Sequence, residues 1–307
     1  MIAGGINLNN RKRFIRDQGL TSIEVISGFA KGKIELPNLP KEITKDEYTT
    51  YCSMFIHDGA LMVCGGGANN YDTSYDRNEP WKCFQLNDGM WKEHSTLNRK
   101  RANSAIVTTK KGTFIFGGNQ KQFCKTYEYL PTGSTKWKNG KRSQLPGGVW
   151  RGCAIEVKSK QEIWLLGGHP RKERILSFDV NSHTSTELPF ALLNERESFA
   201  CAFIPGTDKI IVTGGISDFK HQSSCEIIDT KDGTVTMASP MNYRRCGHGM
   251  GIIKINGEER LAVLGGTQGY GKVHDSIELY NIKTLKWELA EDLEMDIPRF
   301  CFGFVSI

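Results

Sequence analysis

The sequence predicts an all-β protein, a β-propeller of six blades, and three observations carry this prediction. A pair of adjacent glycines closes a short apolar run six times along the 307 residues, at Gly4, Gly65, Gly117, Gly167, Gly214 and Gly265. The pairs lie about 50 residues apart, a period typical of propeller blades. Each repeat reads as four short strands, and the two ends of the chain supply complementary parts of one blade.

The first strand of each repeat alternates small with apolar residues and follows an arginine. Small side chains suit strands that converge on the central channel of a propeller, while the alternate residues pack between blades. These leading arginines are Arg101, Arg151, Arg196, Arg245 and Arg299.

The later strands of each repeat are predicted from their apolar content. The second strand is the apolar run that ends in the glycine pair, the third carries aromatic or apolar residues, and the fourth follows a turn. Trp91, Trp137 and Trp287 lie on fourth strands. Their repeated position favours packing between blades over ligand binding, because a tryptophan buries a large apolar area.

The two ends of the chain are expected to form one blade together. The chain begins at a second strand, residues 1–5, and finishes with an arginine-led first strand, residues 299–307. Joining them closes the ring with hydrogen bonds and removes the exposed edges of an open sheet. We therefore expect a single domain over residues 1–307. The spacing between the first two glycine pairs is the longest, which indicates an insertion around residues 9–19.

Composition and cysteine content fit an ordinary globular protein. The chain is 38% apolar and 24% charged, with no apolar run long enough to span a membrane. No start resembling a signal peptide is seen, which favours a cytoplasmic location. The nine cysteines form no close pair of the kind that binds zinc. Five of them lie in equivalent first strands, where core packing is favoured over redox or metal roles: Cys52, Cys153, Cys201, Cys246 and Cys301.

With these features in place, the chain resembles the kelch-repeat β-propellers over its whole length. Its closure by a C-terminal inner strand is similar to the propellers of kelch-like ubiquitin-ligase adaptors. The resemblance implies a scaffold for protein–protein interaction. The upstream BTB domain that recruits the ligase in that family is not in this sequence, so the resemblance gives adaptor activity no support from this chain alone. Two departures are blades without the tryptophan and a first strand at Tyr51 without the arginine.

Propeller sites usually form at one end of the channel, from the loops after the second strands and before the first strands. We call this end the channel mouth. The predicted partner-binding residues there are Arg99, Arg101, Trp150, Arg151, His169, Arg171, Arg196, Arg244, Arg245, Arg299, Asn69, Gln120 and Gln268. Converging guanidinium groups favour carboxylates and phosphates. Because the kelch-like adaptors bind short acidic peptides at matching positions, the resemblance implies the same ligand class here.

An alternative role for the repeated arginines is structural, since each one could bridge blades and hold loop carbonyls. This alternative stays open for every arginine that leads a first strand. Arg99, Arg171 and Arg244 lie just off the repeated position and are therefore the better candidates for partner binding.

We expect a non-catalytic protein-interaction module that binds an acidic or phosphorylated segment, with no cofactor and no catalytic or metal-binding set. The net charge of +6 comes from scattered basic runs, so neither a nucleic acid nor a membrane is expected as a partner. The main alternative is an enzyme acting on a sugar or another small anion. A deep pocket holding His169, His221 or Glu195 near the arginines would favour that alternative. A purely structural role, such as cross-linking through the outer faces of the blades, is the third.

Overall fold

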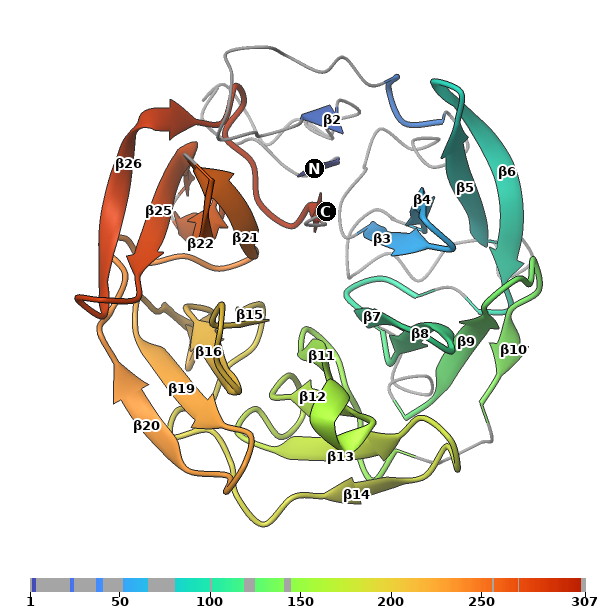
Figure 1. Ribbon diagram of the computed structural model, residues 1–307, viewed down its shortest axis with the longest axis horizontal. Helices are drawn as coiled ribbons and strands as arrows, with labels where there is room; N and C mark the ends of the chain where they lie inside the picture. Colours follow the sequence, from blue (N-terminus) through green and yellow to red (C-terminus); the bar gives the residue numbers. More distant parts are fainter. Residues whose placement is uncertain are drawn as a thin grey trace.

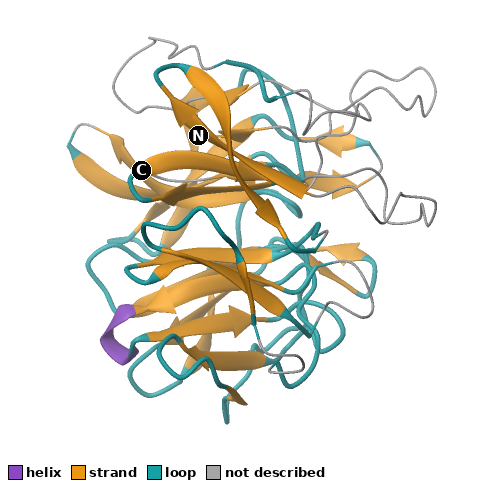
Figure 2. Cartoon of the chain, turned by 90° about the vertical axis from the view of Figure 1, so that its right-hand side faces the viewer, coloured by secondary structure: helices purple, strands orange, loops and turns teal. Residues whose placement is uncertain are grey.

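The computed structural model is a β-propeller whose blades surround a central axis (Figure 1). The described residues are 2–3, 23–24, 37–40, 52–65, 81–99, 101–118, 125–140, 145–255, 257–269 and 271–304. In these ranges strands and loops predominate, with one 3-10 helix, η1 (Lys158–Lys160) (Figure 2). No helix in them is long and apolar enough to cross a membrane.

Five four-stranded antiparallel blades follow one another around the axis, each ordered from the channel outward. Blade 1 contains β3 (Ser53–His57), β4 (Ala60–Cys64), β5 (Trp81–Asn87) and β6 (Met90–Leu97). Blade 2 contains β7 (Ala105–Thr109), β8 (Gly112–Phe116), β9 (Tyr127–Pro131) and β10 (Lys138–Asn139). Blade 3 contains β11 (Cys153–Val157), β12 (Glu162–Leu166), β13 (Ile175–Asp179) and β14 (Ser185–Glu187).

The last two blades each carry an additional hairpin after the second strand. Blade 4 contains β15 (Ala200–Phe203), β16 (Lys209–Thr213), β19 (Cys225–Asp229) and β20 (Val235–Ala238). Blade 5 contains β21 (Gly249–Ile255), β22 (Glu258–Leu264), β25 (Ser276–Asn281) and β26 (Lys286–Glu294). The hairpins are β17 (Ile216–Ser217) with β18 (Lys220–His221), and β23 (Thr267–Gly269) with β24 (Lys272–Val273).

The two ends of the chain meet in a separate three-stranded sheet. Here β1 (Ile2–Ala3) pairs with both β2 (Ile23–Glu24) and β27 (Gly303–Phe304). The described residues thus show five four-stranded blades, not the six that the sequence predicts. The expected insertion at residues 9–19 lies outside the described residues.

The glycine pairs fasten each blade to the next one. The N–H of the second glycine donates to a main-chain carbonyl in the loop that leads into the next inner strand. An example is the hydrogen bond from Gly215 to Arg245 at 2.8 Å. Both Gly214 and Gly215 have positive φ, and a Cβ added to Gly214 would lie 2.4 Å from that carbonyl oxygen. Only glycine combines this left-handed backbone with so close an approach.

A second set of main-chain hydrogen bonds runs around the channel, which we call the hoop. Its members share positive φ and lie two residues before the inner strands, at Asn103, Arg151, Ser198, Gly247 and Cys301. Each N–H from Arg151 onward donates to the carbonyl of the preceding member, at 2.8 to 3.0 Å. The hoop therefore joins successive blades without using side chains.

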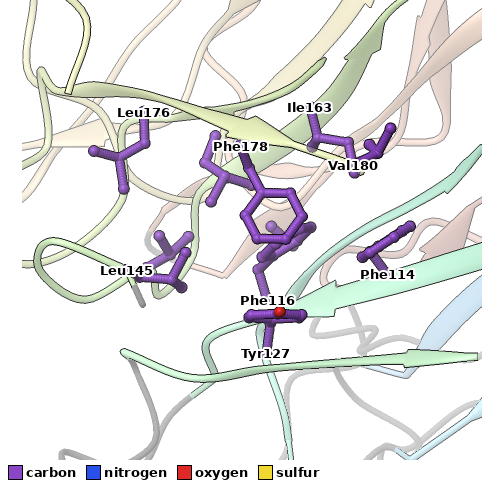
Figure 3. Close-up of a cluster of buried hydrophobic side chains, with 11 residues drawn as sticks. Phe114, Phe116, Tyr127, Leu145, Ile163, Leu176, Phe178 and Val180 are labelled. Atoms are coloured by element: carbon purple, nitrogen blue, oxygen red, sulfur yellow. The ribbon is translucent and has the colours of Figure 1, made fainter. Parts of the chain in front are cut away.

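Aromatic side chains fill the seams between blades, as predicted for two of the three tryptophans. Trp137 is buried against Phe55 of blade 1, and its Nε1 donates to Ser95 Oγ at 3.1 Å. Trp287 is buried in a cluster shared by blades 4 and 5. Between blades 2 and 3, Phe116 and Phe178 pack edge to face at 5.1 Å (Figure 3).

Candidate functional site

The inner strands surround a cavity of about 340 Å³ at the axis of the propeller. Its wall is formed by β3, β7, β11, β15, β21 and β27. Most of the lining residues are small or apolar, as the alternating first strands predict. Among the polar side chains in the wall, Ser104, Arg151 and His248 each have a buried polar atom without a hydrogen-bond partner among the described residues.

Arg151 is held at the cavity between an aromatic ring and a carboxylate. Its guanidinium carbon lies 4.6 Å from the centre of the Trp150 ring, a distance suited to a cation–π contact. Its Nη1 lies 3.6 Å from Glu197 Oε1 of the next blade. Trp150 Nε1 and Arg151 Nε are buried and have no hydrogen-bond partner among the described residues. Two buried N–H donors without a described partner thus lie beside one positive charge.

His169 extends this cluster from the loop after β12. Its N–H donates to the Trp150 carbonyl at 2.8 Å, and the two rings meet edge to face at 5.5 Å. The His169 side chain is exposed. Trp150, Arg151, His169 and Glu197 therefore form one group, which we call the mouth cluster. The sequence predicts the first three, but it gives no signal for Glu197 beyond its place after Arg196.

His248 lies deeper in the wall and stays neutral near physiological pH. Its Nε2 hydrogen-bonds with Thr213 Oγ1 at 2.9 Å. Burial, reinforced by the nearby Arg245 guanidinium, lowers the pKa of His248 to about 3. The side chain therefore contributes a hydrogen-bonding nitrogen to the cavity but no charge.

Four of the predicted partner-binding arginines are buried inside the protein. Their exposed fractions are 0 or 1%: Arg101, Arg196, Arg245 and Arg299. Their burial supports the structural alternative, and we no longer assign them to partner binding.

The contacts of three of these arginines follow one pattern, with Arg196 as the example. Its Nη2 lies 2.8 Å from Glu226 Oε1 on the third strand of the blade, and its Nη1 donates to the Gly214 carbonyl at 2.7 Å. The carboxylate of Glu226 also accepts the N–H groups of Leu193 and Asn194. The loop that enters blade 4 is thus fixed at both its side chains and its backbone. The corresponding pairs are Arg101 with Glu128 and Arg245 with Glu278.

Arg151 does not occupy the position of these arginines, which corrects the sequence alignment of the repeats. The inner strands align through the residue that faces the end of the second strand, which is Ala200 in blade 4 and Cys153 in blade 3. Arg196 precedes Ala200 by four residues, so Val149 is its counterpart in blade 3. Arg151 is instead a hoop residue, and this shift places the residue in the wall of the cavity.

The remaining predicted residues that the structure describes differ in exposure. Arg244 is exposed, and Arg99 and Gln268 are half-buried. Arg171 is exposed and pairs with Glu187 at 2.9 Å and with Glu173. Asn69 and Gln120 lie outside the described residues. The mouth is therefore less basic than the sequence predicts, since most of its arginines are buried or paired.

The sequence features that would favour an enzyme do not gather in the cavity. His169, His221 and Glu195 are absent from its described wall. In the described part of the chain no three His, Cys, Asp or Glu side chains lie together in a way that could hold a metal ion.

Two of the five cysteines assigned to core packing form a disulfide instead, which corrects that prediction. Cys153 and Cys201 are joined between blades 3 and 4 with a Cα–Cα distance of 6.2 Å. A second disulfide joins Cys64 and Cys83 within blade 1. Disulfides are more common in oxidising compartments. They lend no support to the cytoplasmic location, which stays a prediction.

Comparisons with known proteins define the class of this molecule as a β-propeller. The chain superposes on the structure of YjhT with a TM-score of 0.64 and 13% identity, covering 82% of this chain and 86% of YjhT. No protein-family model matches the sequence, and no curated protein matches it. At this level of identity the likeness shows the shared fold alone.

Proposed function

We propose that this propeller is a non-catalytic interaction module that binds an acidic or phosphorylated segment of a partner protein at the mouth cluster. The observation that carries the proposal is the placement of Arg151. Arg151 lines the cavity, its guanidinium lies against the Trp150 ring, and the buried donors Arg151 Nε and Trp150 Nε1 have no partner among the described residues. A carboxylate or phosphate oxygen satisfies such donors better than a neutral group does.

The surrounding residues set the direction and the limits of this binding. Arg244 adds an exposed positive charge on the loop between β20 and β21, while Glu197 lies beside Arg151. A partner carboxylate would therefore approach the guanidinium from the side away from Glu197. The kelch resemblance supports the same ligand class, since related propellers of the adaptor type bind acidic peptides at this end.

We further propose that the three-stranded sheet at the chain ends belongs to a sixth blade that closes the ring. In this sheet Ile2 faces Phe304 on one side and Glu24 on the other. In blade 4, Val212 faces Cys201 and Glu226 in the same way. The terminal sheet thus repeats the register of a complete blade, including a glutamate at the third-strand position.

The test is to replace Arg151 with alanine and to measure binding of fluorescein-labelled oligoglutamate and phosphoserine peptides by fluorescence anisotropy. Truncating a charged group that contacts the ligand is expected to weaken binding by about 2 kcal/mol or more. The melting temperature is expected to change little, because the described contacts of the Arg151 guanidinium are one long ion pair and one cation–π contact, which are both weak interactions.

The matched control is Lys231→Ala, which removes the same charge. Lys231 lies in the turn between β19 and β20 and pairs with Asp208 of the β15–β16 turn at 3.0 Å, so it is at the opposite end of the blade. We expect this variant to bind like the wild type. Equal losses in the two variants would show that net charge and not the mouth cluster governs binding, and would refute the proposal.

A further inference from the structure

The disulfide between Cys153 and Cys201 lies in the wall of the central cavity. Cys153 begins β11 and Cys201 is the second residue of β15, so the bond links the inner strands of blades 3 and 4. Both residues are partly exposed and both line the cavity. A small reagent that enters the channel therefore meets the part of the wall that carries this disulfide.

The same seam between blades 3 and 4 carries the mouth cluster. Arg151 lies two residues before Cys153, and Glu197 lies four residues before Cys201. The Arg151–Glu197 ion pair at 3.6 Å and the hoop bond from Ser198 N–H to the Arg151 carbonyl at 2.8 Å cross this seam. The disulfide is the one covalent link beside these two weaker contacts, so it fixes the distance between the strands that carry them.

This arrangement is particular to one seam of the described propeller. The strand registers identify the residues that are equivalent to Cys153 and Cys201 at the other seams between blades. The equivalent pairs are Ser53 with Ile106, Ala105 with Ala154, Ala200 with Met250, Gly249 with Phe304, and Gly303 with Met54. The other disulfide, Cys64–Cys83, joins neighbouring strands of one sheet and is buried.

We propose that Cys153–Cys201 is a redox site, opened from the channel by a small thiol of the glutathione class, whose reduction loosens the mouth cluster and weakens ligand binding there. The regulatory part of this proposal rests on the proposed function of the mouth. It assigns to the seam a role that goes beyond holding the fold.

The chemistry is a two-electron thiol–disulfide exchange. The thiolate of one small thiol attacks one sulfur, forming a mixed disulfide and releasing the other cysteine as a thiolate that takes up a proton. A second small thiol attacks the mixed disulfide, releases the remaining cysteine, and leaves as the oxidised small disulfide. Cys52 also lines the cavity, but burial raises the pKa of its thiol to about 11, so it stays protonated and does not compete at neutral pH.

The experiment uses the full chain and two double variants. Cys64→Ala with Cys83→Ala leaves the channel bond in place, and Cys153→Ala with Cys201→Ala removes it. Each protein is purified without reductant and then treated with reduced glutathione, and its thiols are alkylated and mapped by mass spectrometry. Anisotropy of the oligoglutamate peptide reports binding, and hydrogen exchange of the segment that contains the Ser198 amide reports the seam.

We expect reduction to lower peptide affinity about fivefold or more and to speed exchange at Ser198, in the wild type and in the variant that keeps the channel bond. The variant without that bond should behave as the reduced protein does from the start. Finding Cys153 and Cys201 as thiols before reduction overturns the proposal, as does a mapped reduction that changes neither affinity nor exchange. If the peptide fails to bind the oxidised protein, the proposed function fails, and exchange at Ser198 alone decides the redox site.

Discussion

Blades 3 and 4 hold the loop that enters the blade in two different ways. In blade 4 a buried ion pair, Arg196 with Glu226, fixes the entering loop. In blade 3 the equivalent positions hold Val149 and Leu176, and both side chains join the apolar cluster shared with blade 2. Figure 3 shows Leu176 at the edge of that cluster. Neither blade keeps only one member of the pair.

The comparison shows why the two positions change together. A buried charge without its partner is costly, whereas a matched apolar pair of similar shape is tolerated. In blade 3 the loop carbonyls are held from another direction, because Arg174 on the third-strand side donates to Pro146 and Gly148. In blade 3 the cationic side chain therefore comes from the third-strand side, and its N–H groups still donate to carbonyls of the entering loop.

The largest effect that tests this comparison is expected from Glu226→Leu, which copies one half of the blade 3 arrangement into blade 4. The Arg196 guanidinium is fully buried, so the variant leaves a charge without its carboxylate. We expect a loss of about 3–5 kcal/mol in the free energy of unfolding. Urea denaturation followed by tryptophan fluorescence measures it.

The control is the double variant Arg196→Val with Glu226→Leu, which places both of the blade 3 residues at the equivalent positions of blade 4. Removing both charges should recover part of the loss, so the double variant should be more stable than Glu226→Leu alone. A double variant that loses the sum of the two single effects would show that the pair does not act as a unit.

A smaller effect is expected from Arg174→Met, which tests the substitute contact in blade 3. The variant leaves the carbonyls of Pro146 and Gly148 without their donor, and we expect a loss of about 1–3 kcal/mol in stability. Arg171→Met is the matched control, since Arg171 is exposed and its ion pairs contribute little. Similar melting temperatures for the two variants would contradict the role given to Arg174.

The smallest effect concerns the pH dependence of stability, to which His248 at the start of blade 5 contributes. The native pKa of His248 is about 3, whereas an unfolded histidine titrates near 6.5. Between these values the unfolded chain binds more protons, so stability is present above pH 6.5 and falls as the pH is lowered. We expect His248→Gln to show a shallower decline in melting temperature from pH 7 to about pH 4.5. An unchanged slope would exclude His248 as a source.

The repeated parts of the fold could be predicted from the sequence, because glycine pairs and apolar runs recur with the blade period. The position of Arg151 could not be predicted. Arg151 lies two residues after the position equivalent to Arg196, and this difference is visible only once the strand register is known. The burial of Arg196 and its equivalents depends on a glutamate on a distant strand, which local spacing does not reveal. The Cys153–Cys201 disulfide likewise depends on which inner strands lie next to each other in the fold.

The hoop has a consequence for how this molecule could acquire new ligands. Its bonds join main-chain atoms only, from Asn103 through Arg151 and Ser198 to Cys301. This part of the link between the inner strands therefore does not depend on which side chains the hoop residues carry. Residues can be exchanged there to recognise a different molecule while the scaffold beneath keeps its shape, which is how one architecture comes to serve unrelated purposes.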